Sequence, residues 1–422
     1  MKKQIRLLAG MMAMSLILVS CEEPEPAPQP TPEKTVKTLQ FTAAEQELVQ
    51  HCNDFSFNLL TQVAQNETQE NIVLSPLSAS MLLGMLMNGA DGQTLAQIQA
   101  VTGFSSHASI ESINAYYRQL IDVLPNLDSC TTLGLANGIW ARQDFPVYPA
   151  FTNACKQSFD AQAKNVPTFL DDEVIAEINR FAADHTNNRI KEILKKEMVT
   201  ENTVMALMNA LYFKALWETQ FDKEYTYAYP FATLGGTEIK TDMMNKADTM
   251  SYAEGSDYQL LELPYKGGKY CVDLVLPAKG ADINAWLKTL DGNKWQTMLA
   301  GTSSEDVVLM LPKFCLHYDR TLTEDLQALG MIDAFSRLKA NFSLLSSAPT
   351  YVSLIKQKTF LQVDEEGTEA AAVTIGVVEY TSAGPSNSKY FTANRPFLFV
   401  IRERDYGTIL FTALIGHPEW EE

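Results

Sequence analysis

The chain has 422 residues, 46% of them hydrophobic, which is enough for one large domain or two ordinary ones with a substantial core. Its 33 Lys and Arg residues against 51 Asp and Glu residues give a formal net charge of −18. This acidity would repel nucleic-acid phosphates, so it excludes nucleic acid as a partner and otherwise favours only solubility.

The first 20 residues have the pattern of a signal peptide. Basic residues in MKKQIR precede an apolar run from Leu7 to Val19 that is too short to span a bilayer comfortably. The run ends in LVSC, which resembles the bacterial lipobox and implies cleavage before Cys21 and acylation of that cysteine. The alternative is an ordinary signal peptide with a chance cysteine. Several acyl chains on Cys21 would give durable membrane anchoring, because they bury many methylenes.

A proline-rich tether follows, in which alternating prolines favour extended conformations. We therefore divide the chain into a signal peptide (1–20), an acylated cysteine with its tether (21–40) and one domain (41–422). The expected protein is an exported, monomeric lipoprotein anchored in the outer membrane. Glu22 and Glu23 weakly resemble signals for export to the cell exterior, so a surface-exposed and a periplasm-facing orientation are the two alternatives.

The first third of the domain is predicted to be mainly helical. Apolar residues between Leu48 and Val63 recur three or four positions apart, as on an amphipathic helix. Ser75 is a plausible N-cap with Pro76 at the first helical position, and the apolar residues that follow predict a buried helix. A surface helix with an acidic start is expected from residue 171.

Strands dominate from about residue 204. Short apolar runs bounded by turn residues occur in VMALMNALYF, KYCVDLVLP, DVVLMLPKF, PFLFVIRE and TILFTALI. Gly267 and Gly268 lie between two strand-like runs and predict a hairpin. Helices followed by strands indicate an α+β fold.

No catalytic or metal-binding motif is present: G-x-S-x-G, H-E-x-x-H, Walker A and G-x-G-x-x-G are all missing. The histidines are isolated, and the cysteines after Cys21 include no C-x-x-C pair. We expect no enzyme activity, no metal and no cofactor. Most of these cysteines are expected to be small buried hydrophobic residues, and a single disulfide among them is the alternative.

Five ordered blocks between residues 71 and 418 resemble the serpin family. The blocks are NIVLSPLSASMLLGMLMNGADGQTLAQI, MNALYFKALWETQF, LPKF with LQALGMIDAF, DEEGTEAAA, and NRPFLFVIRERDYGTILFTALIGHP. The resemblance implies about nine helices, three β-sheets and an exposed reactive-centre loop. It also implies a suicide-substrate inhibitor of serine and sometimes cysteine endopeptidases, whose cleaved loop inserts into the main sheet while the protease stays covalently attached.

DEEGTEAAA resembles the family's hinge, the segment that inserts first. Its residues are Glu365, Gly367, Thr368, Glu369, Ala370, Ala371 and Ala372. Gly367 would absorb the backbone rotation at the pivot, and Thr368 would be the first side chain to be buried. Because side chains alternate along a strand, residues 368, 370, 372 and 374 would face the core together.

Two further groups follow from the same resemblance. Ser75, Ser78, Asn209 and Gln357 match the shutter, the buried polar cluster that governs opening of the main sheet. The family usually has histidine where this chain has Gln357, which offers similar hydrogen bonds without titrating. Trp217 matches the tryptophan of the breach, near the insertion point; an ordinary core aromatic is the alternative.

Family spacing from the hinge places the scissile bond between Thr381 and Ser382, with Tyr380 as the alternative residue on its amino side. Counting back from RPF instead points near Pro385. Thr381 suits elastase-like proteases, and Tyr380 would suit chymotrypsin- or subtilisin-like ones. Two competing hypotheses are a non-inhibitory serpin that serves as a surface binding or carrier protein, and an unrelated nutrient-binding lipoprotein.

Overall fold

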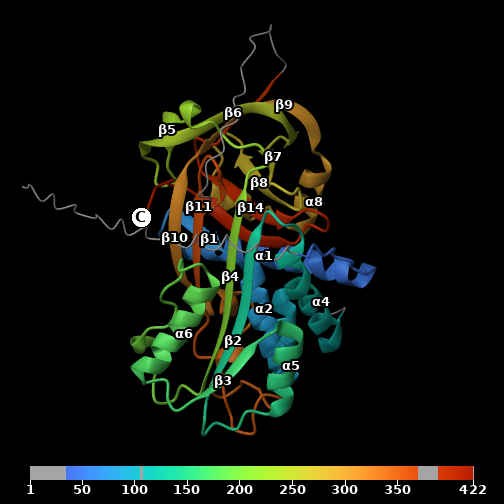
Figure 1. Ribbon diagram of the computed structural model, residues 1–422, viewed down its shortest axis with the longest axis vertical. Coiled ribbons are helices and arrows are strands. Elements are labelled where there is room, and N and C mark those ends of the chain that lie inside the picture. Colours follow the sequence, from blue (N-terminus) through green and yellow to red (C-terminus); the bar gives the residue numbers. More distant parts are fainter. Residues whose placement is uncertain (1–34, 105–107, 369–387, 422) are drawn as a thin grey trace, which may run out of the picture. The chain divides into compact units, whose positions relative to one another are not determined.

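The computed structural model describes residues 35–104, 108–368 and 388–421 (Figure 1). Residues 35–422 form one compact unit. The signal peptide, Cys21 and the first part of the tether lie outside the described residues.

The described residues contain nine α-helices, in line with the number expected. They are α1 (Ala43–Asn66), α2 (Pro76–Met87), α3 (Gly92–Thr102), α4 (Ile110–Val123), α5 (Pro149–Phe159), α6 (Asp172–His185), α7 (Ile283–Leu287), α8 (Gly292–Ala300) and α9 (Thr323–Ala328). Ser75 caps α2 by accepting a hydrogen bond from the Ser78 amide, and Pro76 opens the helix, as predicted. None of these helices is both long and apolar enough to cross a membrane.

A six-stranded sheet, the main sheet, carries the features that matter for function. Its order is β10 (Phe314–Thr321), β11 (Lys356–Val363), β12 (Gly367–Thr368), β4 (Met205–Leu216), β2 (Thr132–Arg142) and β3 (Gln162–Val166). The long strand β2 lies within the part of the chain that the sequence predicted to be mainly helical. β2 pairs with β4 in an antiparallel register that sets Asn137 opposite Asn209.

The other strands form a nine-stranded network around the long strand β6 (Glu238–Glu254). One group is β1 (Asn71–Leu74), β15 (Ile409–Ile415), β14 (Phe397–Glu403), β8 (Tyr270–Pro277) and β7 (Tyr258–Pro264); the other is β5 (Tyr227–Ala232), β9 (Ser303–Pro312) and β13 (Lys389–Thr392). β6 joins them because its two ends pair with β7 and with β5. The described strands therefore form two hydrogen-bonded sheets where the resemblance implied three, because β6 connects the two groups into one. The hairpin at Gly267 and Gly268, both at positive φ, connects β7 and β8 as predicted.

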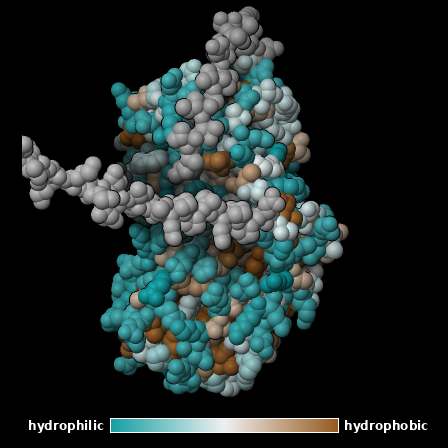
Figure 2. All heavy atoms as spheres, viewed as in Figure 1, coloured by the Kyte–Doolittle hydropathy of each residue, from teal (hydrophilic) through white to brown (hydrophobic). Residues whose placement is uncertain are grey.

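Two hydrophobic cores lie on opposite faces of the main sheet. Strand alternation sends Leu211 and Phe213 of β4 into the larger core, which includes α2, and Met208 into a smaller one beneath α6. Figure 1 shows α6 alongside β2 and β4. On the face shown in Figure 2 the described surface is mainly hydrophilic, with hydrophobic residues in small scattered groups.

None of the five cysteines in the described part of the chain forms a disulfide with another of them. Four are buried, as expected for small core residues, and Cys130 is exposed. Burial raises the pKa of the Cys52 and Cys155 thiols to about 12, so both are neutral and unreactive at physiological pH.

Candidate functional site

A slot lies between β11 and β4 in the middle of the main sheet. Strand β12 is only two residues long, and it sits between them at one end: Thr368 is opposite Val363 on one side and Ala215 on the other. Both pairings are antiparallel, so β11 and β4 run in the same direction. Among the described residues no other strand lies between β11 and β4.

Only glycine fits at the start of this short strand. A Cβ atom on Gly367 would lie 2.1 Å from the Ala215 carbonyl oxygen and 2.7 Å from the Leu216 Cα. Both are backbone atoms, which cannot rotate away. The sequence argument relied on the conformational freedom of Gly367, but the structure shows that the residue is required for close approach to β4.

Thr368 is already buried, with 2% of its surface exposed. Its hydroxyl lies 2.5 Å from the Tyr265 hydroxyl, and the Tyr265 ring stacks on Trp217 at a centroid distance of 4.8 Å. The expectation that Thr368 becomes buried during insertion therefore needs correction, because this side chain occupies the slot before any cleavage.

Three successive hinge carbonyls are held by the chain that follows β4. The Trp217 indole N–H donates to Asp364, the Phe221 amide to Glu365 and the Trp217 amide to Glu366, each at 2.9 Å. Trp217 is thus more than a core aromatic, since both of its N–H groups bind the hinge. These bonds fix the hinge backbone where it turns into the slot.

Two hinge carboxylates, those of Glu365 and Glu366, have basic partners. Glu365 is 3% exposed and pairs with Lys313 at 2.9 Å, while its other oxygen accepts from the Thr226 hydroxyl. Burial opposes ionisation of Glu365, but the bonds from Lys313, the backbone and Thr226 outweigh it, so its pKa is lowered. Glu366 pairs with the exposed Lys223, an interaction worth little in water.

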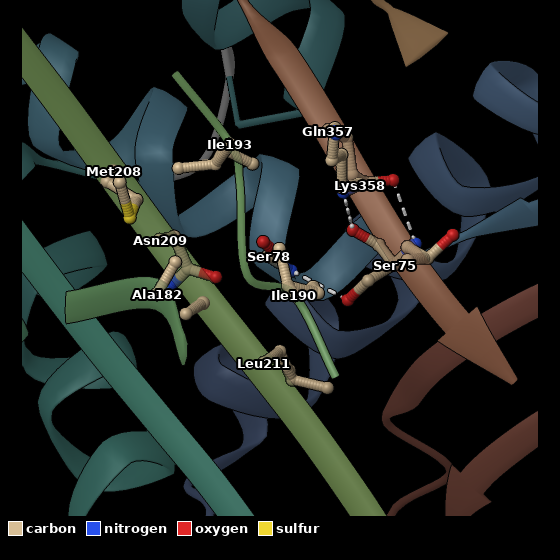
Figure 3. Close-up of a pocket in the computed structure, with 12 residues that line it drawn as sticks. Ser75, Ser78, Ala182, Ile190, Ile193, Met208, Asn209, Leu211, Gln357 and Lys358 are labelled. Carbon is tan, nitrogen blue, oxygen red and sulfur yellow. Dashed lines mark hydrogen bonds between the residues drawn. The ribbon is translucent and has the colours of Figure 1, made fainter. Parts of the chain in front are cut away.

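The shutter residues surround one small hollow at the middle of the slot, which has room for about one water molecule (Figure 3). Gln357 of β11 accepts from the Ser75 amide at 3.0 Å and donates to the Ser75 carbonyl at 2.8 Å. Ser75 in turn accepts from the Ser78 amide. Gln357 therefore ties β11 to the start of α2 through groups that do not titrate.

Asn209 lines the same hollow but belongs to a different hydrogen-bond network. Its amide nitrogen donates to the Asn137 side chain at 2.7 Å and contacts the Met81 sulfur. Its carbonyl oxygen is buried and has no partner among the described residues; Figure 3 shows it directed toward Ser78. The sequence argument missed Asn137, although a lone asparagine in the apolar run LANGIW was a usable signal.

The segment after α6 covers the slot from the outside. Ile190 and Ile193 line the hollow, and the Arg189 guanidinium lies 4.6 Å from the Phe360 ring centroid on β11. The same segment also packs on the core beneath α6, which contains residues of β2 and β4. It therefore contacts the strands on both sides of the slot.

Other predicted site residues fall outside the described part of the chain. They are Cys21, the hinge residues Glu369, Ala370, Ala371 and Ala372, and the cleavage-site residues Tyr380, Thr381 and Ser382. In the described part, one cluster has metal-ligand geometry, formed by Glu262, Cys271 and Asp273. Arg402 binds both of its carboxylates, so this cluster is a buried ion-pair network.

The comparisons with known proteins agree on one family. The family model "Serpin (serine protease inhibitor)" matches residues 50–418. Human Serpin B12 is 32% identical over 397 residues, covering 86% of this chain and 98% of that protein. Human leukocyte elastase inhibitor is 31% identical over 376 residues, covering 86% and 97%.

Solved structures give the same result. Tengpin, a thermophilic serpin, is 32% identical in its native state with a TM-score of 0.81, covering 91% of this chain and 97% of that one. The latent state of tengpin gives a TM-score of 0.75, with 29% identity and 92% and 100% coverage. The described fold is thus more similar to the native than to the latent form.

Proposed function

Because the chain belongs to the serpin family, we propose that it inhibits serine endopeptidases, and cysteine endopeptidases as a second class, by loop cleavage and insertion. The observation that carries the proposal is the slot between β11 and β4, which already holds Gly367 and Thr368 at one end. The chain leaving Thr368 is the one that contains the alanine-rich segment and the predicted scissile bond.

The register of β12 predicts how the inserted strand would pair. Thr368 lies opposite Ala215, so continuing antiparallel pairing sets residue 369 against 214 and, because β4 begins at Met205, residue 378 against 205. On the other side Thr368 lies opposite Val363, and β11 reaches back to Lys356, which would pair with residue 375. The slot would therefore take residues 369–378 against β4 and residues 369–375 against β11, a stretch that contains the three alanines.

The same register would bring Thr374 between two shutter residues. Counting six positions from Thr368 leads to Asn209 on β4 and to Gln357 on β11. Thr374 has the same strand parity as Thr368, so its hydroxyl would face inward. The buried, unpaired carbonyl oxygen of Asn209 would then be an available acceptor for that hydroxyl.

The protease would supply the catalytic groups that cleave the loop. Its serine oxygen would add to the Thr381 carbonyl carbon, the C–N bond to Ser382 would break, and the amine released at Ser382 would take up a proton and leave. Thr381 would stay attached as an ester. Insertion of the strand behind it would carry the protease away and distort its active site before water could deacylate it.

The proposed targets are elastase-like enzymes for Thr381 and chymotrypsin- or subtilisin-like enzymes for Tyr380. The likeness to human leukocyte elastase inhibitor supports the first class. No Lys or Arg lies between Val363 and Ser388, which disfavours trypsin-like enzymes. The chain itself would act as an inhibitor, not as an enzyme.

Incubation with pancreatic elastase or chymotrypsin, followed by denaturing electrophoresis, tests the proposal. A covalent complex that survives denaturation is expected, with release of a peptide beginning at Ser382 or Thr381. Thr368→Arg is the control, since a cation in the slot should turn the inhibitor into a substrate. Clipped protein without a complex would refute the proposal and favour the non-inhibitory carrier alternative.

We also propose that the mature protein is a monomer, anchored in the outer membrane through acylated Cys21. The signal-peptide pattern and LVSC support this placement. Labelling of cells with a fatty-acid analogue should mark the wild type and leave Cys21→Ser unlabelled. Protease accessibility on intact cells would separate the surface-exposed from the periplasm-facing orientation.

A further inference from the structure

The last described residues of the chain form an isolated β-bridge with β10, which lies at the edge of the main sheet. Trp420 pairs in parallel with Cys315 of β10: the Cys315 amide donates to the Glu419 carbonyl at 2.8 Å, and the Glu421 amide donates to the Cys315 carbonyl at 3.0 Å. Asn71 holds the start of this tail, because its side chain accepts from the Gly416 and His417 amides. We call residues 416–421 the C-terminal tail.

The tail meets the hinge through one lysine. The Lys313 ammonium lies 2.9 Å from the Glu365 carboxylate and 5.4 Å from the centroid of the Trp420 ring. Its side chain is 25% exposed, and that of Glu365 is 5% exposed. A single cation therefore contacts the hinge on one side and the last aromatic residue of the chain on the other.

Each of these contacts helps the other. An ammonium over an indole face is attracted by the ring's negative quadrupole. A free lysine side chain would lose rotamer entropy to reach Glu365, and the Trp420 ring restricts those rotamers in advance.

We propose that Trp420 is a positioning residue for the hinge: by holding Lys313 against Glu365, the C-terminal tail keeps β12 seated in the slot. Loss of the ring would let the hinge leave the slot more often. If the protein inhibits proteases as proposed above, insertion would also start later from an unseated hinge. Hydrolysis of the acyl-enzyme would then precede insertion more often. The effect on the hinge itself does not depend on that proposed function.

Two backbone amides report on hinge seating without any protease. The Trp217 and Phe221 amides donate to hinge carbonyls, so their hydrogen exchange accelerates when the hinge departs. We expect Trp420→Leu to speed their exchange about two- to fivefold, the effect of losing one partly exposed cation–π contact. Trp420→Phe keeps an aromatic face and should stay closer to wild type.

Two controls separate positioning from general loosening. Glu419→Gln alters the tail at a residue whose side chain binds Asn71 rather than Lys313, and should leave the exchange unchanged. In a Lys313→Met background, Trp420→Leu should add nothing, because the link is already broken.

The inference is overturned if Trp420→Leu exchanges like wild type, or if its full effect persists in Lys313→Met. It is also overturned if β14 amides accelerate equally, since that indicates global destabilisation. A wild type that forms no covalent protease complex would instead count against the proposed function, and the exchange results would stand.

Discussion

Gly367→Ala tests the role of the seated hinge directly. The new methyl carbon would lie 2.1 Å from the Ala215 oxygen and 2.7 Å from the Leu216 Cα, both of them backbone atoms. Such overpacking costs about 1–3 kcal/mol. Leaving the slot relieves it but gives up the pairing of Gly367 and Thr368 with β4, at about 1 kcal/mol for each hydrogen bond.

The hydrogen bonds are lost on opening in both proteins, so we expect the variant hinge to open more readily by the overpacking cost of about 1–3 kcal/mol, which corresponds to roughly 5- to 150-fold. Hydrogen exchange at the Trp217 and Phe221 amides should accelerate by that factor, and the number of inhibitor molecules consumed per protease should rise. Gly301→Ala is the matched control, because its φ is −81° and its nearest contact to a new Cβ would be 3.4 Å. Equal exchange and equal consumption in the two variants would refute the steric argument.

Three other predictions concern the slot and the hinge. Thr374→Val should reduce the gain in stability on loop cleavage by about 1–3 kcal/mol, because the Asn209 oxygen would stay buried without a donor. Thermal unfolding of the cleaved and uncleaved proteins measures this gain, and an undiminished gain would contradict the predicted register. The Gln357→His variant should lose stability relative to wild type as the pH falls from 7 to 5, because a protonated imidazole cannot accept a hydrogen bond from the Ser75 amide. Equal profiles of stability against pH in the two proteins would show that this contact does not govern opening of the sheet. In the folded state the pKa of Glu365 lies below its usual value of 4.5. The stability that its ionised carboxylate gives to the hinge is therefore fully present above pH 4.5 and is lost as the pH falls through the lowered pKa. Protection of the Phe221 amide should therefore fall in acid in the wild type and change less in Glu365→Gln, and parallel curves would argue against the Lys313 ion pair.

Much of the fold could be predicted from local sequence. The cap at Ser75 and Pro76, the hairpin at Gly267 and Gly268 and the apolar strands are encoded over a few residues each, and all appear in the structure. Strand β2 was not predicted, because it lies among helices and its role depends on pairing with β4.

The site was predicted only in part, because its key contacts join distant segments. Lys313, Tyr265 and Trp420 carry no local signal; they meet the hinge only once the strands are in register. Likewise, the need for glycine at Gly367 depends on the approach of β4, which the hinge sequence does not reveal. The hinge sequence indicated which segment inserts, but not that Thr368 is already seated.

Cleaving the loop and measuring thermal unfolding tests the central claim, that the slot accepts the loop as a new strand. About ten further residues would pair with β4 and about seven of them also with β11, adding on the order of 10 kcal/mol at about 1 kcal/mol for each hydrogen bond. The account predicts that protein cleaved between residues 380 and 383 unfolds about 10 °C or more above the intact protein. An unchanged or lower unfolding temperature after complete cleavage would contradict it.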